Sequence, residues 1–153
     1  MTILSKKIYT NSEQETFSLG RSIGKVITPG VVIGFEGELG AGKTVFIKGI
    51  LAGLGYEPRN VASASFVLVQ EYKARFHVVH IDLYRLGDNI VIEELGWDDY
   101  CSKENIVLIE WVEKVKDILT VDVLVKINLL TENEKRLIEI NAEDVKFLEG
   151  III

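Results

Sequence analysis

The stretch Gly37-Glu38-Leu39-Gly40-Ala41-Gly42-Lys43-Thr44 matches the pattern G-x-x-x-x-G-K-[ST] at every fixed position. It follows a continuous apolar run, residues 31–35, and opens a segment, residues 43–54, whose apolar side chains recur at helical spacing. A buried strand, a glycine-rich loop and a helix in this order make a cradle for phosphate, because backbone N–H groups and the helix N-terminus point at one anion. Lys43 would then reach the β- and γ-phosphates of a nucleotide, and the Thr44 hydroxyl would bind Mg²⁺. The loop residues expected to contact the phosphates are Glu38, Leu39, Gly40, Ala41, Gly42, Lys43 and Thr44.

Strand and helix signals alternate along the rest of the chain. A capping box, Ser12 to Glu15, predicts the start of a helix that runs to about Val26. Strands are predicted at residues 2–9, 31–35, 66–72, 76–82, 106–109, 121–130 and 136–141, and further helices at 43–54, 89–95 and 112–119. Residues 56–65 are predicted to form a loop, and the short link at 73–75 predicts an antiparallel strand pair. The pattern predicts one α/β domain over residues 1–153, a P-loop NTPase-like three-layer sandwich with a mixed, mainly parallel sheet.

The composition excludes several classes of protein. The chain has 17 Lys+Arg against 23 Asp+Glu, a net charge of −6, which disfavours a stand-alone nucleic-acid-binding module. A hydrophobic content of 48% argues against disorder, and no run approaches the roughly 18 apolar residues of a membrane span. The single cysteine, Cys101, favours a reducing compartment, and nothing in the sequence predicts a signal peptide. We therefore expect a soluble, cytoplasmic protein without a membrane partner.

Two acidic residues follow apolar strands and are candidates for a Mg²⁺ site. Asp82 ends the run 78–81, and Glu110 ends the run 106–109. Open α/β sheets bind ligands at the carboxyl ends of their strands, and a magnesium–triphosphate site needs an acid there. The sequence leaves open which of the two holds Mg²⁺ and which orients an attacking water. ATP is favoured over GTP because the chain lacks the N-K-x-D pattern that reads guanine.

Other residues allow two interpretations. His77 and His80 lie three apart in a predicted strand and so face opposite sides, which argues against a joint metal site. Trp111 either flanks the nucleotide or packs the sheet edge. The basic, aromatic segment 72–85 is either a solvated hairpin tip or an RNA contact, and the acidic segment 93–99 is either a partner surface or a helix end that covers the sheet.

Several segments together resemble one family. They are Gly37–Thr44, Ser63–Tyr72, His80–Leu86, Glu94–Gly96 and Ile109–Trp111, and their order resembles the TsaE (YjeE) family, bacterial P-loop ATPases of tRNA threonylcarbamoyladenosine biosynthesis. The resemblance implies an ATPase that works with TsaB and TsaD, which transfer a threonylcarbamoyl group to an adenosine beside the tRNA anticodon. It further implies that ATP keeps this transfer complex turning over, and that tRNA is bound mainly by the partners.

The resemblance also implies roles for single residues. It assigns Lys43 to the phosphates, Thr44 and Glu110 to Mg²⁺, and Asp82 to a second metal contact or to the attacking water. Further assignments are Ser63–Phe66 as a switch-like loop near the γ-phosphate, Thr10 near the base, and Arg136 on the other side of the nucleotide. The chain has Ser63-Ala64-Ser65 where the family has Ser-Pro-Thr, and losing the proline predicts a more mobile loop.

Two alternatives to an ATPase remain open. A small-molecule kinase should carry an arginine-rich lid, whereas Arg59, Arg75 and Arg85 are scattered. A docking subunit would bind ATP without hydrolysing it.

Overall fold

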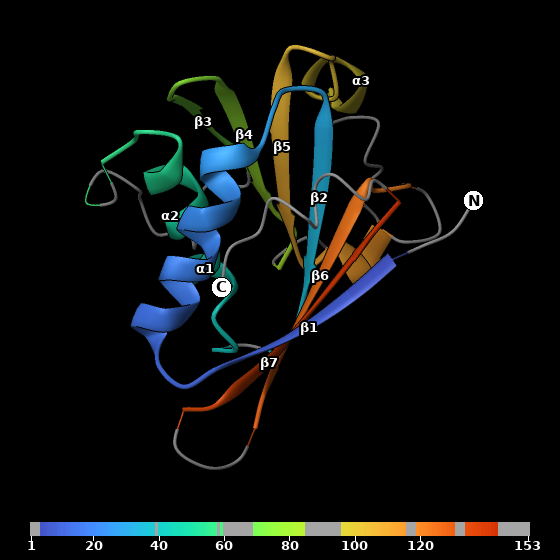
Figure 1. Cartoon of the computed structure of the whole chain (residues 1–153). Helices are drawn as coiled ribbons and strands as arrows, with labels where there is room; N and C mark the ends of the chain where they lie inside the picture. Colours follow the sequence, from blue (N-terminus) through green and yellow to red (C-terminus); the bar gives the residue numbers. More distant parts are fainter. Residues whose placement is uncertain are drawn as a thin grey trace.

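The structure of the chain is a computed structural model that describes residues 4–38, 40–57, 59, 69–84, 96–115, 119–130 and 134–143. A seven-stranded sheet in the order β1-β7-β6-β2-β5-β4-β3 forms its centre (Figure 1). The strands are β1 (Leu4–Thr10), β2 (Val31–Glu36), β3 (Val69–Lys73), β4 (His77–Asp82), β5 (Asn105–Glu110), β6 (Val123–Leu129) and β7 (Arg136–Ala142).

The sheet is mixed, as predicted. Strand β2 pairs in parallel with β5 and β6, and β4 pairs in parallel with β5. The pairings β1–β7, β6–β7 and β3–β4 are antiparallel. Five strands therefore run in one direction, and only β7 and β3 run against them. The antiparallel β3–β4 pair confirms what the short link at 73–75 predicted.

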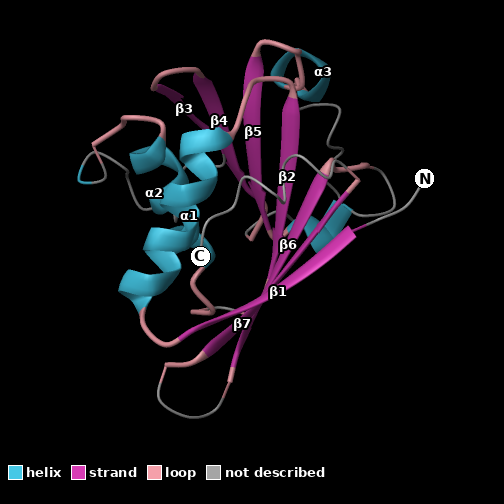
Figure 2. Cartoon of the chain, in the orientation of Figure 1, coloured by secondary structure: helices cyan, strands magenta, loops and turns pink. Residues whose placement is uncertain are grey.

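Helices cover both faces of the sheet (Figure 2). On one face α1 (Glu13–Val26) and α2 (Lys43–Gly53) pack against each other, and on the other lie α3 (Trp97–Tyr100) and the 3₁₀ turn η3 (Val112–Val115). Ser12 caps α1 as predicted, because its hydroxyl accepts a hydrogen bond from the Glu15 backbone N–H at 3.1 Å.

Alternate side chains of the strands enter two separate cores. Val78, Ile106 and Leu108 face the layer of α1 and α2, whereas Val79, Val107 and Ile109 face α3 and η3. Side chains alternate along a strand, so the two sets mark the two faces of one sheet. This arrangement gives the predicted three layers. It also places Asp82 and Glu110, which share the parity of Val78 and Leu108, on the face that carries α2.

The structure differs from the sequence prediction at two described elements, the short helix α3, which was not predicted, and the segment after β5. A helix was expected over residues 112–119, whereas the structure has a 3₁₀ turn over Val112–Val115, with residues 116–118 outside the described part. Val112 and Val115 are both buried in the second core, and a 3₁₀ turn places residues three apart on one side. The predicted helix at 89–95 and most of the predicted loop at 56–65 lie outside the described residues. No described helix is long and apolar enough to cross a membrane.

Candidate functional site

The glycine-rich loop joins the end of β2 to the first turn of α2. Gly42 immediately precedes this helix with a φ of 111°, in the left-handed region that favours glycine. A Cβ at this position would also lie 3.1 Å from Nε of Arg136. The loop therefore needs glycine here both for its backbone turn and for the approach of the arginine. Leu39 lies outside the described residues.

Lys43, at the start of α2, folds back onto its own loop. Its ammonium donates to the backbone carbonyls of Gly37 and Glu38, the latter at 2.9 Å, and the residue is only 5% exposed. Burial lowers the pKa of Lys43, against the opposing charge of Glu110 and of the more weakly acting Glu113, Asp82 and Glu38. The cation thus lies over the loop that was expected to hold phosphate.

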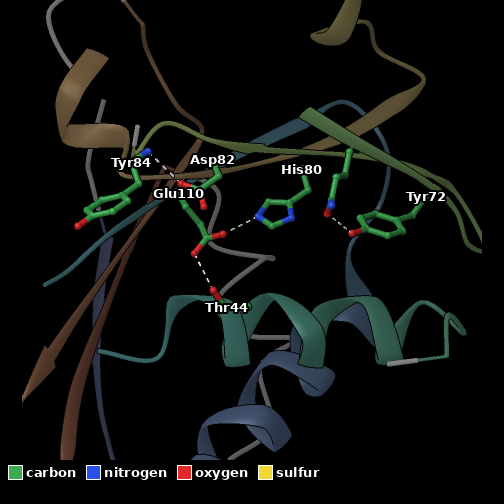
Figure 3. Close-up of polar contacts among 7 residues, drawn as sticks. Thr44, Tyr72, His80, Asp82, Tyr84 and Glu110 are labelled. Atoms are coloured by element: carbon green, nitrogen blue, oxygen red, sulfur yellow. Dashed lines mark hydrogen bonds and ion pairs between the residues drawn. The ribbon is translucent and has the colours of Figure 1, made fainter. Parts of the chain in front are cut away.

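The two predicted acids lie side by side at the carboxyl ends of β4 and β5. Asp82 and Glu110 are direct partners in the parallel register of these strands. The Thr44 hydroxyl, from α2, donates to Glu110 Oε1 at 3.0 Å, and the backbone N–H of Tyr84 donates to Asp82 Oδ1 at 2.9 Å (Figure 3). Burial, and to a lesser degree the nearby Glu110, raise the pKa of Asp82. The fold thus gathers Thr44, Asp82 and Glu110 into one group of oxygen donors.

His80 belongs to the same group, although the sequence interpretation gave it no role. Its Nε2 lies 2.6 Å from Glu110 Oε2, and the residue is 1% exposed. His77 instead contacts Glu71 at 2.9 Å near the surface, so the two imidazoles have different partners, as their spacing predicted. A signal was present: His80 precedes Asp82 by two residues in one strand and therefore shares its face.

Of the two interpretations that the sequence left open for Trp111, the structure shows packing against the sheet. Its ring packs against the second core, and the Lys43 ammonium lies 4.0 Å from the ring centroid. The ring of Tyr84 lies 4.9 Å away on a centroid-to-centroid measure. The backbone of Trp111 has a φ of 61°, unusual for a bulky residue. This conformation turns the chain sharply after β5, where the indole meets the lysine.

Glu113 is a further acid at the loop that the sequence interpretation missed. It accepts a backbone hydrogen bond from Gly37, and burial raises its pKa. Its Oε1 is buried and has no hydrogen-bond partner within the described part of the chain. In the sequence, Glu113 could have been noticed as an acid three residues after Glu110. Its contact with the glycine-rich loop, however, depends on the turn that follows β5, which the sequence did not predict.

Thr10 and Arg136 lie on neighbouring strands, and Arg136 contacts the glycine-rich loop. They are register partners in the β1–β7 pairing. Arg136 is 5% exposed and donates from Nε to the carbonyl of Ala41 at 2.8 Å. The Thr10 hydroxyl lies 2.8 Å from that of Thr16 on α1, in a buried contact. The predicted switch-like loop Ser63–Phe66 lies outside the described residues.

Comparison with known proteins identifies the family of this chain. A family model described as "Threonylcarbamoyl adenosine biosynthesis protein TsaE" matches residues 10–138. The chain belongs to the TsaE family. The match runs from the last residue of β1 to the third residue of β7 and includes every site residue discussed above, so the predicted family resemblance is confirmed.

Single members of the TsaE family resemble the chain over most of its length. Two relatives carry the name "tRNA threonylcarbamoyladenosine biosynthesis protein TsaE". That of Rickettsia typhi is 36% identical and covers 90% of this chain and 95% of its own. That of Haemophilus influenzae is 41% identical, and the match covers 74% of this chain and 71% of the Haemophilus protein. The crystal structure of Bacillus subtilis YdiB superposes with a TM-score of 0.78 at 25% identity, over 98% of this chain and 93% of that one. The predicted P-loop NTPase-like fold is therefore confirmed.

Proposed function

We propose that this protein is a Mg²⁺-dependent ATPase that serves tRNA threonylcarbamoyladenosine biosynthesis. In this role, hydrolysis of ATP keeps the TsaB–TsaD threonylcarbamoyl transfer complex turning over. Membership of the TsaE family supports the pathway. The observation that carries the chemistry is the hydrogen bond between Thr44, at the start of α2, and Glu110, at the end of β5. It joins the glycine-rich loop to the strand-end acids in one site.

The residues present fit a magnesium–nucleotide. Mg²⁺ prefers oxygen donors and is commonly bound by one or two carboxylates together with substrate phosphates. The Thr44 hydroxyl and the carboxylates of Glu110 and Asp82 are such donors. The described residues contain no group of three or more His, Cys, Asp or Glu that could hold a metal ion by themselves. A site of this kind therefore suits a metal that arrives with a phosphate, and the metal would supply charge neutralisation at the phosphates.

Each residue of the chain then has a distinct task. Lys43 exchanges its two carbonyl contacts for phosphate oxygens, which are stronger acceptors for an ammonium group. Glu110 and Thr44 would hold the metal side of the nucleotide, and Asp82, held by the Tyr84 N–H, would either share the metal or orient the water that attacks. Arg136 is bound to the loop carbonyl of Ala41 on the side away from the acids, and Thr10 is its register partner in β1.

The described arginines favour a slow ATPase over a small-molecule kinase. Arg75 donates to the carbonyl of Gly24, Arg136 donates to that of Ala41, and Arg59 contacts Glu57. None of these three guanidinium groups is bound at the strand-end acids, where a transition-state arginine would act. We therefore expect slow hydrolysis by the isolated protein and faster turnover with its partners.

Reconstituted tRNA threonylcarbamoylation, with and without this protein and ATP, tests the proposal. We expect repeated rounds of modification only when both are present, and loss of this support in Lys43→Ala and Glu110→Ala. Rapid phosphate transfer to a metabolite would favour the kinase instead. Sustained modification with a hydrolysis-dead Glu110→Ala protein would favour a docking subunit.

The net charge of the protein agrees with a role in which the partner proteins, and not this subunit, bind the tRNA. A net charge of −6 opposes tight binding of tRNA by this subunit, so we place the tRNA on the partner proteins and this subunit beside them in the cytoplasm. Any direct contact with tRNA should involve the described basic residues Lys73 and Arg75 at the β3–β4 hairpin. Tight tRNA binding by the isolated protein at physiological salt would contradict this arrangement.

A further inference from the structure

His80 and Glu110 form a buried contact at the centre of the site. The distance between Nε2 and Oε2 is 2.6 Å, and the two side chains are 1% and 3% exposed. A carboxylate accepts hydrogen bonds and donates none, so His80 Nε2 carries the proton of this bond. A hydrogen bond to an ionised acceptor, shielded from water, is among the stronger ones in proteins.

This contact completes a two-point attachment of the Glu110 carboxylate. Oε1 accepts from the Thr44 hydroxyl, and Oε2 faces His80 (Figure 3). The last torsion of a glutamate side chain is otherwise broad, so a carboxylate held at one oxygen can swing. With both oxygens held, the group cannot rotate without breaking a bond. Oε1 therefore stays turned toward α2 and Thr44.

A purely structural role for His80 explains the geometry less well. Its Nδ1 is buried and has no hydrogen-bond partner among the described residues. The side-chain oxygen of the cross-strand neighbour Gln70 accepts from the Tyr72 hydroxyl, and no Gln70 atom is hydrogen-bonded to His80 Nδ1. An unsatisfied buried polar group costs about 1–3 kcal/mol, whereas an aliphatic side chain would fill this strand position without that cost. The contact with Glu110 is what the histidine provides.

We infer that His80 is a positioning residue that fixes the Glu110 carboxylate, so that its Oε1 remains directed at the metal side of the nucleotide. The inference rests on the proposed function, since it assigns His80 to the orientation of a Mg²⁺-binding acid. His80 acts through Glu110. Removing such a partner of a metal-binding side chain typically weakens metal affinity about 10- to 100-fold.

The test compares three substitutions of His80 and one of His77. In His80→Gln the side-chain amide N–H extends about as far from the backbone as Nε2 does. In His80→Asn the amide N–H extends only as far as Nδ1, and His80→Leu has no N–H at all. His77→Leu is the matched control, because His77 lies in the same strand but contacts Glu71 near the surface. Mn²⁺ is titrated into each protein in the presence of ADP and followed by electron paramagnetic resonance. ADP binding in EDTA and thermal unfolding are measured alongside.

We expect Mn²⁺ affinity to fall at least about tenfold in His80→Leu and His80→Asn, to recover in His80→Gln, and to be unchanged in His77→Leu. ADP binding in EDTA should be equal in all four variants. If His80→Leu does not fold, the Mn²⁺ affinities of His80→Gln and His80→Asn decide whether His80 positions Glu110. Equal Mn²⁺ affinity in the folded His80 variants and the wild type overturns the inference but leaves the proposed function intact. A wild-type protein that binds no Mn²⁺ with ADP overturns both.

Discussion

The Lys43 ammonium lies 4.0 Å from the centroid of the Trp111 indole, between the glycine-rich loop and the end of β5. A cation over an indole face is attracted by about 0.5–2 kcal/mol. The same ammonium donates to the carbonyls of Gly37 and Glu38. The lysine is therefore held by groups that a phosphate would have to displace.

This contact predicts a fluorescence signal for nucleotide binding. When Lys43 moves to phosphate, the charge over the Trp111 ring is withdrawn, and the emission of that indole should change. The measurement uses Trp97→Phe, which leaves Trp111 as the only tryptophan, titrated with ADP and Mg²⁺. Trp111→Phe is the control and should give a flat titration, because Trp97 lies in α3 beside the start of β5, whereas Thr44 and Glu110 meet at the end of this strand. A flat response from Trp111 at saturating nucleotide would contradict the prediction.

A second prediction concerns the hydroxyl that bridges α2 and β5. Thr44→Val keeps the shape of the side chain but removes the donor to Glu110 Oε1. We expect Mg²⁺-dependent ATP hydrolysis to fall by about 10- to 100-fold, since a metal contact and the orientation of Glu110 are lost together. Thr44→Ser retains the hydroxyl and should stay within a few-fold of wild type. Comparable rates for Val and Ser would show that the hydroxyl has no part in the reaction.

Much of this site could be predicted because its signals are local. The apolar run of β2, the glycines and the first turn of α2 are contiguous, and each acid directly follows its own apolar strand. Asp82 and Glu110 were therefore predicted to reach one edge of the sheet, and the structure makes them register partners.

The relations that were not predicted depend on the order of strands. His80 and Glu110 are 30 residues apart and meet only because β4 lies beside β5. Sequence periodicity gives the faces of a strand but not its neighbours. The contact of Lys43 with Trp111 further requires the positive φ of Trp111, which a bulky residue rarely adopts. Neither feature leaves a local pattern in the chain.

The raised pKa of Asp82 predicts that this acid destabilises the metal-free protein at neutral pH. Burial is the largest cause of the shift, and repulsion by Glu110 adds to it. A carboxyl whose pKa is raised on folding costs no stability below its unfolded pKa, and stability falls as the pH rises through the folded value. Asp82→Asn should therefore raise the unfolding temperature at pH 7 but not below about pH 3.5, while it impairs ATP hydrolysis. The prediction would be contradicted if the gain in unfolding temperature of Asp82→Asn over wild type were smaller at pH 7 than below about pH 3.5.

Cys101 should be a poor nucleophile despite partial exposure. Burial, with smaller contributions from Asp122 and Asp98, raises the pKa of the Cys101 thiol to about 11. Since the thiolate is the reactive form, about 0.1% of the thiol is reactive at pH 8. Alkylation by iodoacetamide, followed by mass spectrometry, should be slow at pH 8 and accelerate up to about pH 11. The urea-unfolded protein is the control and should react at the rate of a free thiol; a native protein that matches this rate would refute the prediction.

The last prediction tests the packing of α1 against α2, on which the position of the loop depends. A Cβ on Gly20 would lie 2.2 Å from the backbone carbonyl oxygen of Phe46, a contact that only movement of a helix can relieve. Alanine gains about 1 kcal/mol over glycine in helix propensity, but overpacking typically costs about 1–3 kcal/mol and here opposes backbone. We expect Gly20→Ala to lower the free energy of unfolding by about 2 kcal/mol, or roughly 4–8 °C in Tm. Arg21→Ala, at the next and exposed position of α1, controls for the helix and should shift Tm little. Nucleotide affinity should fall in Gly20→Ala but not in Arg21→Ala, because displacement of α2 would move Lys43 and Thr44 with it. An unchanged Tm in Gly20→Ala would contradict the close packing of the two helices.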